Sequence, residues 1–63
     1  MQKPIYNVYS KRNKLVAVIN ECTNSRNDAV SYNYIGKFAG CRSTLEECFD
    51  SFNQMGSYRF EEI

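Results

Sequence analysis

Hydrophobic residues recur at helical spacing in one stretch of the chain. Five apolar residues share one face of a helix there: Leu45, Cys48, Phe49, Phe52 and Met55. Their spacing predicts an amphipathic helix over about residues 44–55. Ser43 is a suitable N-cap, and Glu46 three residues later completes a capping box. Gly56 can adopt the left-handed conformation that ends a helix.

The remaining apolar residues favour strands. Residues 4–9, 15–19, 29–38 and 57–63 are rich in β-branched and aromatic residues, and the last two segments alternate between apolar and polar. Pro4 is tolerable as a first strand residue and favours an edge position. Because residues 15–19 form the most apolar segment, we expect that strand to be central.

Polar segments separate these strands. Residues 10–14 form a hairpin loop in which Asn13 is a natural site for positive φ. Residues 21–28 are predicted to form a loop, which can include one helical turn. Residues 39–42 are predicted to link the third strand to the helix. Gly36 marks a bulge or a close backbone approach within the third strand.

The predicted order is therefore β-β-β-α-β, in a single domain over residues 1–63. The fold class is α+β, with an antiparallel sheet and one helix packed on one face. The last strand runs parallel to the third strand or lies next to the first. The hairpin register stays open, because a shift of one residue moves every side chain to the other face.

Composition sets further bounds on this picture. The chain has 63 residues, 43% of them hydrophobic and 14% aromatic, with a formal net charge of +1. This is a folding composition, and no apolar run reaches the length of about 20 residues that spans a membrane. The N-terminal residues lack the apolar region of a signal peptide, which favours the cytoplasm.

Cysteine usage agrees with a reducing compartment. Cys22, Cys41 and Cys48 are three in number, unevenly spaced, and accompanied by no histidine. Free thiols therefore fit better than a disulfide framework or a zinc site, and we expect no metal or cofactor. Cys48 lies on the apolar stripe of the helix and is expected in the core. Cys41 precedes the helix, where the helix dipole lowers a thiol pKa, although an ordinary loop cysteine is the simpler interpretation.

The strands carry more apolar surface than one short helix can cover. We therefore expect several tyrosines and β-branched residues on the open face of the sheet, as in a protein interface. The candidate tyrosines are Tyr6, Tyr9, Tyr32 and Tyr34. The alternative is a solvated sheet that carries such residues without a partner.

Charge is segregated along the chain. Residues 1–42 hold seven basic and two acidic side chains, whereas residues 43–63 hold one basic and five acidic side chains. The basic candidates for partner binding lie in the first hairpin loop and the acidic ones on the helix: Lys11, Arg12, Lys14, Glu46, Glu47 and Asp50. Such poles orient a small domain towards a charged partner, although a solvated charged face is the common explanation.

Catalysis is not expected, because the sequence has no histidine, no glycine-rich phosphate loop and no metal-spaced cluster. Thr44-Leu45-Glu46-Glu47-Cys48-Phe49, followed by Gly56 and Tyr58-Arg59-Phe60-Glu61, resembles the helix and return strand of small phage-encoded host-takeover proteins. These include inhibitors of host RNA polymerase and anti-CRISPR proteins. The resemblance covers about residues 43–61, has Cys48 where the motif has Ala, and does not extend to the first hairpin. It implies a cytoplasmic inhibitor or adaptor that occludes a larger protein complex.

Two other hypotheses remain open. A nucleic-acid-binding module would use the four tyrosines and Phe38 as a stacking platform, with the hairpin cations and Lys37 as a basic rim. Its low net charge and acidic helix count against it. A two-fold homodimer through the open face is compatible with either function.

Overall fold

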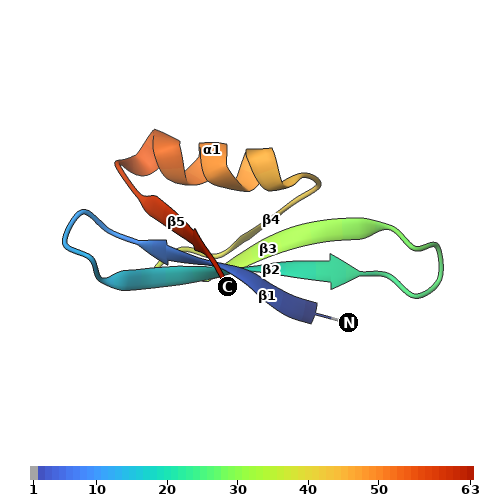
Figure 1. Cartoon of the computed structure of the whole chain (residues 1–63). Helices are drawn as coiled ribbons and strands as arrows, with labels where there is room; N and C mark the ends of the chain where they lie inside the picture. Colours follow the sequence, from blue (N-terminus) through green and yellow to red (C-terminus); the bar gives the residue numbers. More distant parts are fainter. Residues whose placement is uncertain (1) are drawn as a thin grey trace.

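The computed structural model describes residues 2–63 as a twisted five-stranded sheet with one helix lying on one face (Figure 1). Its overall dimensions are 40 × 20 × 17 Å. The elements in chain order are β1 (Gln2–Tyr9), β2 (Leu15–Thr23), β3 (Val30–Gly36), β4 (Gly40–Arg42), α1 (Leu45–Met55) and β5 (Arg59–Glu62). The predicted α+β fold with an antiparallel sheet and one covering helix is confirmed.

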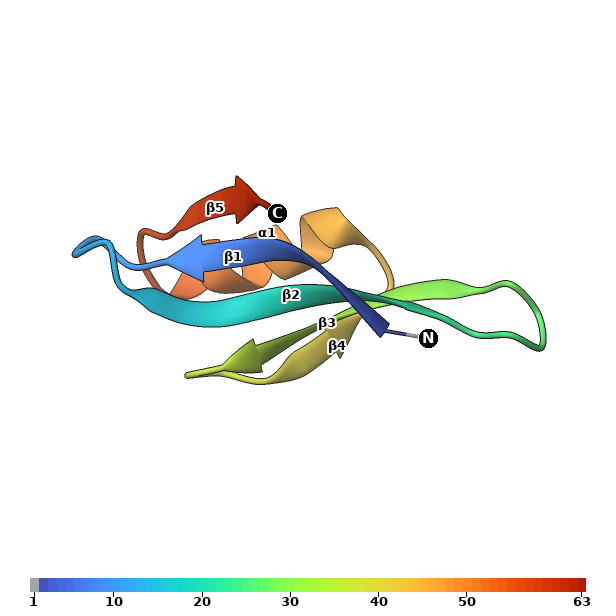
Figure 2. The same cartoon turned by 60° about the horizontal axis from the view of Figure 1, so that its bottom comes forward.

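The strands lie in the order β4-β3-β2-β1-β5, and every neighbouring pair is antiparallel. Figure 2 shows β5 and β4 at opposite edges, so the segment that contains α1 returns the chain across the whole sheet. β5 therefore lies next to β1, one of the two predicted placements. The chain contains one strand more than predicted, because residues 40–42, expected as a link, pair with Tyr32–Tyr34 of β3.

The first hairpin has the predicted loop. Asn13 has a φ of 63°, and the backbone N–H groups of Ser10 and Asn13 donate to the carbonyls of Lys14 and Ser10, both at 2.9 Å. β1 begins at Gln2, two residues earlier than expected, and a bulge lies between Pro4 and Tyr6. β5 pairs only with Tyr6–Tyr9 of β1, so Pro4 lies on a part of β1 beyond that pairing, where the missing N–H of proline is tolerated.

The second hairpin is longer than the sequence indicated. Residues 21–23, expected in a loop, belong to β2 and pair with Val30–Tyr32 of β3. Side-chain hydrogen bonds hold the turn that connects β2 to β3. Asn24 Oδ1 accepts the Arg26 N–H at 2.9 Å, and Asn27 Oδ1 accepts the Ala29 N–H at 3.0 Å. The expectation of a loop from polar composition alone was therefore wrong for these three residues.

Gly36 and Gly40 stand where other atoms come too close for a side chain. A Cβ atom at Gly36 would lie 2.2 Å from the Val16 carbonyl oxygen, which confirms the predicted close backbone approach. At Gly40, a Cβ atom would lie 2.4 Å from the Tyr34 hydroxyl. The small residue thus lets β4 pass over the Tyr34 side chain and pair with β3.

Helix α1 ends at Met55 as predicted, but it begins one residue later, at Leu45, and has a different N-cap. Thr44 Oγ1 accepts the Glu47 N–H at 3.3 Å and donates to Glu47 Oε1 at 3.1 Å, so the capping pair lies one residue later than Ser43 and Glu46. Gly56 is the C-cap as predicted. Its φ of 154° and ψ of −162° lie outside the left-handed helical region, in a region that is open essentially to glycine alone.

The core lies between the sheet and α1. Its buried residues are Val8, Ala17, Ile19, Tyr34, Cys48 and Phe52. The Phe52 ring contacts the rings of Tyr34 and Tyr58 at centroid distances of 4.9 and 5.5 Å. Phe49 packs against Phe60 at 4.4 Å. Cys48 is buried as predicted.

Candidate functional site

Most of the candidate tyrosines lie beneath the helix. Tyr6 and Tyr34 are paired with Ile19 from either side, so all three side chains point to the α1 face. Tyr34 is only 4% exposed, and the Tyr6 ring packs against Phe49 at 5.3 Å. Tyr32 shares this face and is half-buried against the core. The expected tyrosine-rich open face is therefore wrong for these three residues, because the pairing register places them on the covered side.

Apolar residues from three strands occupy part of the open face instead. Leu15 and Ile35 are 55% and 54% exposed. Val18 pairs with Ile35, and Tyr9 pairs with Leu15, so these side chains form two adjacent rows. Leu15, Val18 and Ile35 also line an open hollow of about 220 Å³. We call Tyr9, Leu15, Val18 and Ile35 the open-face patch.

Arg59 extends this row to the edge of the sheet. Tyr9 pairs with Arg59 on its other side, and the guanidinium carbon of Arg59 lies 4.9 Å from the centre of the Tyr9 ring. This distance is typical of a cation–π contact. Arg59 Nη2 also forms a 3.2 Å ion pair with Glu61 Oε2. A continuous row of Arg59, Tyr9 and Leu15 therefore crosses three strands.

The basic residues of the first hairpin lie beside this row. Lys11, Arg12 and Lys14 are all exposed, and we call them the basic tip. Lys37 joins the same end of the sheet, because its backbone N–H donates to the Val16 carbonyl at 2.8 Å. The structure thus brings the predicted basic residues, Lys37 included, together with Arg59, which sequence reasoning did not select.

The acidic candidates form a separate pole. Glu46, Glu47 and Asp50 are exposed on α1. The helix begins over the middle of the sheet and runs towards the hairpin loop between β1 and β2, so its acidic first half points away from the basic tip (Figure 1). Glu47 is partly engaged in capping the helix. The acidic and basic candidates therefore do not form one site.

Sequence reasoning missed Leu15, Val18, Ile35 and Arg59 as members of one surface. The alternation in residues 29–38 did place Ile35 opposite Tyr32 and Tyr34. The missing information was which side the helix covers, and the pairing of distant strands determines that.

Within residues 2–63, no group of three or more Cys, Asp or Glu side chains is arranged to hold a metal ion. No helix in that range is long and apolar enough to cross a membrane. Burial raises the pKa of the Cys48 thiol, and the nearby Arg42 charge partly opposes this shift. A protonated thiol in the core is a poor nucleophile.

Comparison of the chain with protein-family models, with curated proteins and with solved structures finds no match.

Proposed function

We propose that this protein is a non-enzymatic protein-binding module that acts by occluding part of a larger protein complex. It docks through the open-face patch, and the basic tip orients it towards an acidic surface of the partner. The observation that carries the proposal is the pair of exposed side chains Leu15 and Ile35, on a face that no other element of residues 2–63 covers.

Two physical features support this assignment. Exposed apolar clusters bordered by polar groups are typical of protein interfaces. The cations beside the patch favour an acidic partner, because complementary charge steers association. The three cysteines are unpaired, which fits action in a reducing cytoplasm, including that of a bacterial host if a phage encodes the protein. Phage-encoded inhibitors of host machinery remain the functional class that we propose.

Nucleic-acid binding is the weaker alternative. Single-stranded nucleic acid needs exposed aromatic faces on which bases stack. Tyr6, Tyr32 and Tyr34 pack on the helix side, and Tyr9 already stacks with Arg59. The predicted stacking platform is therefore largely absent from residues 2–63.

The test is a tagged pull-down from lysate of the native host, treated with nuclease, with Ile35→Asp and Val30→Asp as matched variants. Both positions are exposed and apolar and lie on β3, but they point to opposite faces of the sheet. We expect one protein complex to be retained by the native chain and by Val30→Asp, and to be lost with Ile35→Asp.

Circular dichroism of both variants checks that they are folded. Loss of all binding after nuclease treatment would move the assignment to nucleic acid. Equal binding by both folded variants would show that the open-face patch is not the docking surface.

A further inference from the structure

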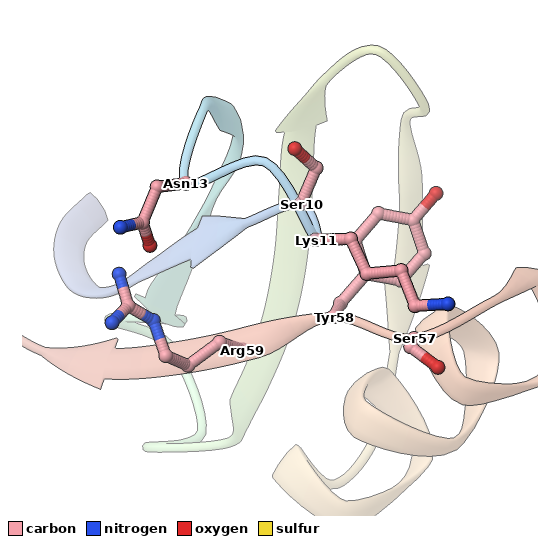
Figure 3. A pocket seen from close by; sticks show the side chains of 6 residues that line it. All are labelled: Ser10, Lys11, Asn13, Ser57, Tyr58 and Arg59. Carbon is pink, nitrogen blue, oxygen red and sulfur yellow. The ribbon is translucent and has the colours of Figure 1, made fainter.

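An open pocket of about 230 Å³ lies between the first hairpin loop and the segment that leads from α1 into β5 (Figure 3). Its lining residues are Ser10, Lys11, Asn13, Ser57, Tyr58 and Arg59. Each of these side chains carries at least one hydrogen-bond donor. Of residues 2–63, no carboxylate is part of this lining, so the pocket presents an electropositive, donor-rich surface.

Two of the lining groups are held in place by neighbours. The Arg59 guanidinium is fixed by its contact with the Tyr9 ring and by the ion pair with Glu61. A guanidinium has five N–H donors, so these contacts leave donors for a ligand. The loop is fixed by its backbone bonds and by the Ser10 hydroxyl, which accepts the Arg12 N–H at 3.3 Å. Figure 3 shows the Asn13 amide and the Arg59 guanidinium on one side, and Lys11 and Ser57 on the other.

The charge balance selects the kind of anion. Figure 3 places Lys11 on the opposite side of the pocket from Arg59, and Arg59 is already paired with Glu61. One positive charge therefore remains for a ligand, which matches a carboxylate with a single negative charge. A phosphate group carries about 1.5 to 2 negative charges at pH 7 and would be left undercompensated.

We infer that this pocket binds one carboxylate, supplied by an Asp or Glu side chain of the partner protein. The inference rests on the proposed function, because the row of Arg59, Tyr9 and Leu15 joins the pocket to the open-face patch. A single partner surface, with an apolar ridge and an acidic side chain at its border, reaches both. The pocket thus adds a specific anchor to the general attraction of the basic tip.

The inference is tested by titrating the ¹⁵N-labelled full chain with the blocked tripeptide acetyl-Ala-Glu-Ala-amide, at constant ionic strength. We expect saturable shifts of the backbone amides of Lys11, Asn13 and Ser57. The isosteric peptide acetyl-Ala-Gln-Ala-amide should produce none. Lys11→Ala should weaken binding about fivefold, the upper range for a solvent-exposed ion pair.

Arg26→Ala is the matched control, because Arg26 is an exposed cation in the opposite hairpin. It removes the same charge and should leave the affinity within about twofold, since distant surface charges are screened. Equal shifts with the Glu and Gln peptides, or an effect of Lys11→Ala no larger than that of Arg26→Ala, would overturn the inference. Tighter binding of acetyl-Ala-phosphoserine-Ala-amide would show that the ligand of the pocket is a phosphate group and not a carboxylate.

This experiment and the pull-down separate the two proposals. A protein partner lost with Ile35→Asp but unaffected by Lys11→Ala would leave the proposed function standing and remove the carboxylate site. Peptide binding without any protein partner in the pull-down would leave the carboxylate site standing and remove the proposed function.

Discussion

Asn20 and Asn33 face each other across β2 and β3 on the open face of the sheet. Asn20 Nδ2 donates to Asn33 Oδ1 at 3.1 Å, and Asn20 is only 8% exposed. Asn33 Oδ1 also accepts a 3.4 Å hydrogen bond from Gln2 Nε2, and Asn33 Nδ2 donates to Cys22 Sγ at 3.2 Å. Asn33 therefore links β2 to β3 and also contacts the first residue of β1, so this polar cluster specifies the strand register.

Removal of one amide of this pair should destabilise the domain. Asn33→Ala leaves the buried Asn20 amide without its acceptor, and an unsatisfied buried polar group costs about 1–3 kcal/mol. The double variant Asn20→Val/Asn33→Val should be closer to the native stability, because it removes both polar groups and places β-branched residues in strands. Urea denaturation measures both free energies of unfolding. A single variant no less stable than the double variant would contradict this account.

Phe52 should be the most sensitive helix position. Its ring is fully buried and packs against Tyr34, Phe38, Tyr58 and Phe60. Phe52→Ala removes these contacts and should cost about 3–5 kcal/mol, enough to unfold a domain of this size. Met55→Ala on the same apolar stripe should cost less, because Met55 is 47% exposed. Thermal unfolding followed by circular dichroism compares the two variants.

The N-cap assignment gives a test between adjacent residues. Thr44→Ala removes the side chain that accepts the Glu47 N–H and should destabilise the domain by about 0.5–2 kcal/mol. Ser43→Ala, which the sequence alone would rank as the harmful change, should have a smaller effect. Equal losses in chemical denaturation would show that the two hydroxyls share the capping role.

The three thiols should react in order of exposure. Cys41 is exposed, Cys22 is half-buried and accepts an N–H from Asn33, and Cys48 is buried. Iodoacetamide treatment of the native protein should alkylate Cys41 first and Cys48 only on unfolding, as read by mass spectrometry of peptides. Early modification of Cys48 would contradict its placement in the core.

The Cys48 thiol also makes the free energy of unfolding depend on pH in the alkaline range. Because burial raises the thiol pKa above its ordinary value of 9.0 in the folded state, the unfolded chain loses this proton first. The stabilisation that Cys48 contributes is therefore complete at pH values below the thiol pKa of the unfolded chain. It is lost as pH rises through the thiol pKa of the folded protein. The stability difference between the native chain and Cys48→Ala should be constant near pH 7 and shrink above about pH 9. A pH series of urea titrations measures it.

The sequence predicted the helix, the antiparallel sheet and the positive φ of Asn13, because each depends on nearby residues. It did not locate the open-face patch, since the side covered by α1 depends on pairing between strands far apart in the chain. Residues 40–42 show the same limit. Three residues carry too little pattern to predict a strand, and β4 forms because Gly40 leaves room for the Tyr34 side chain. The Arg59 contact with Tyr9 joins residues 50 positions apart.

The acidic first half of α1 and the basic tip lie apart in the molecule, so its charge is unevenly distributed. Such a separation of charge acts at distances where apolar contacts do not, so for the proposed partner it would act mainly on the approach. Added salt should therefore slow association much more than it speeds dissociation. For the same reason, the concentration of mobile ions around the protein sets how often an encounter is correctly oriented.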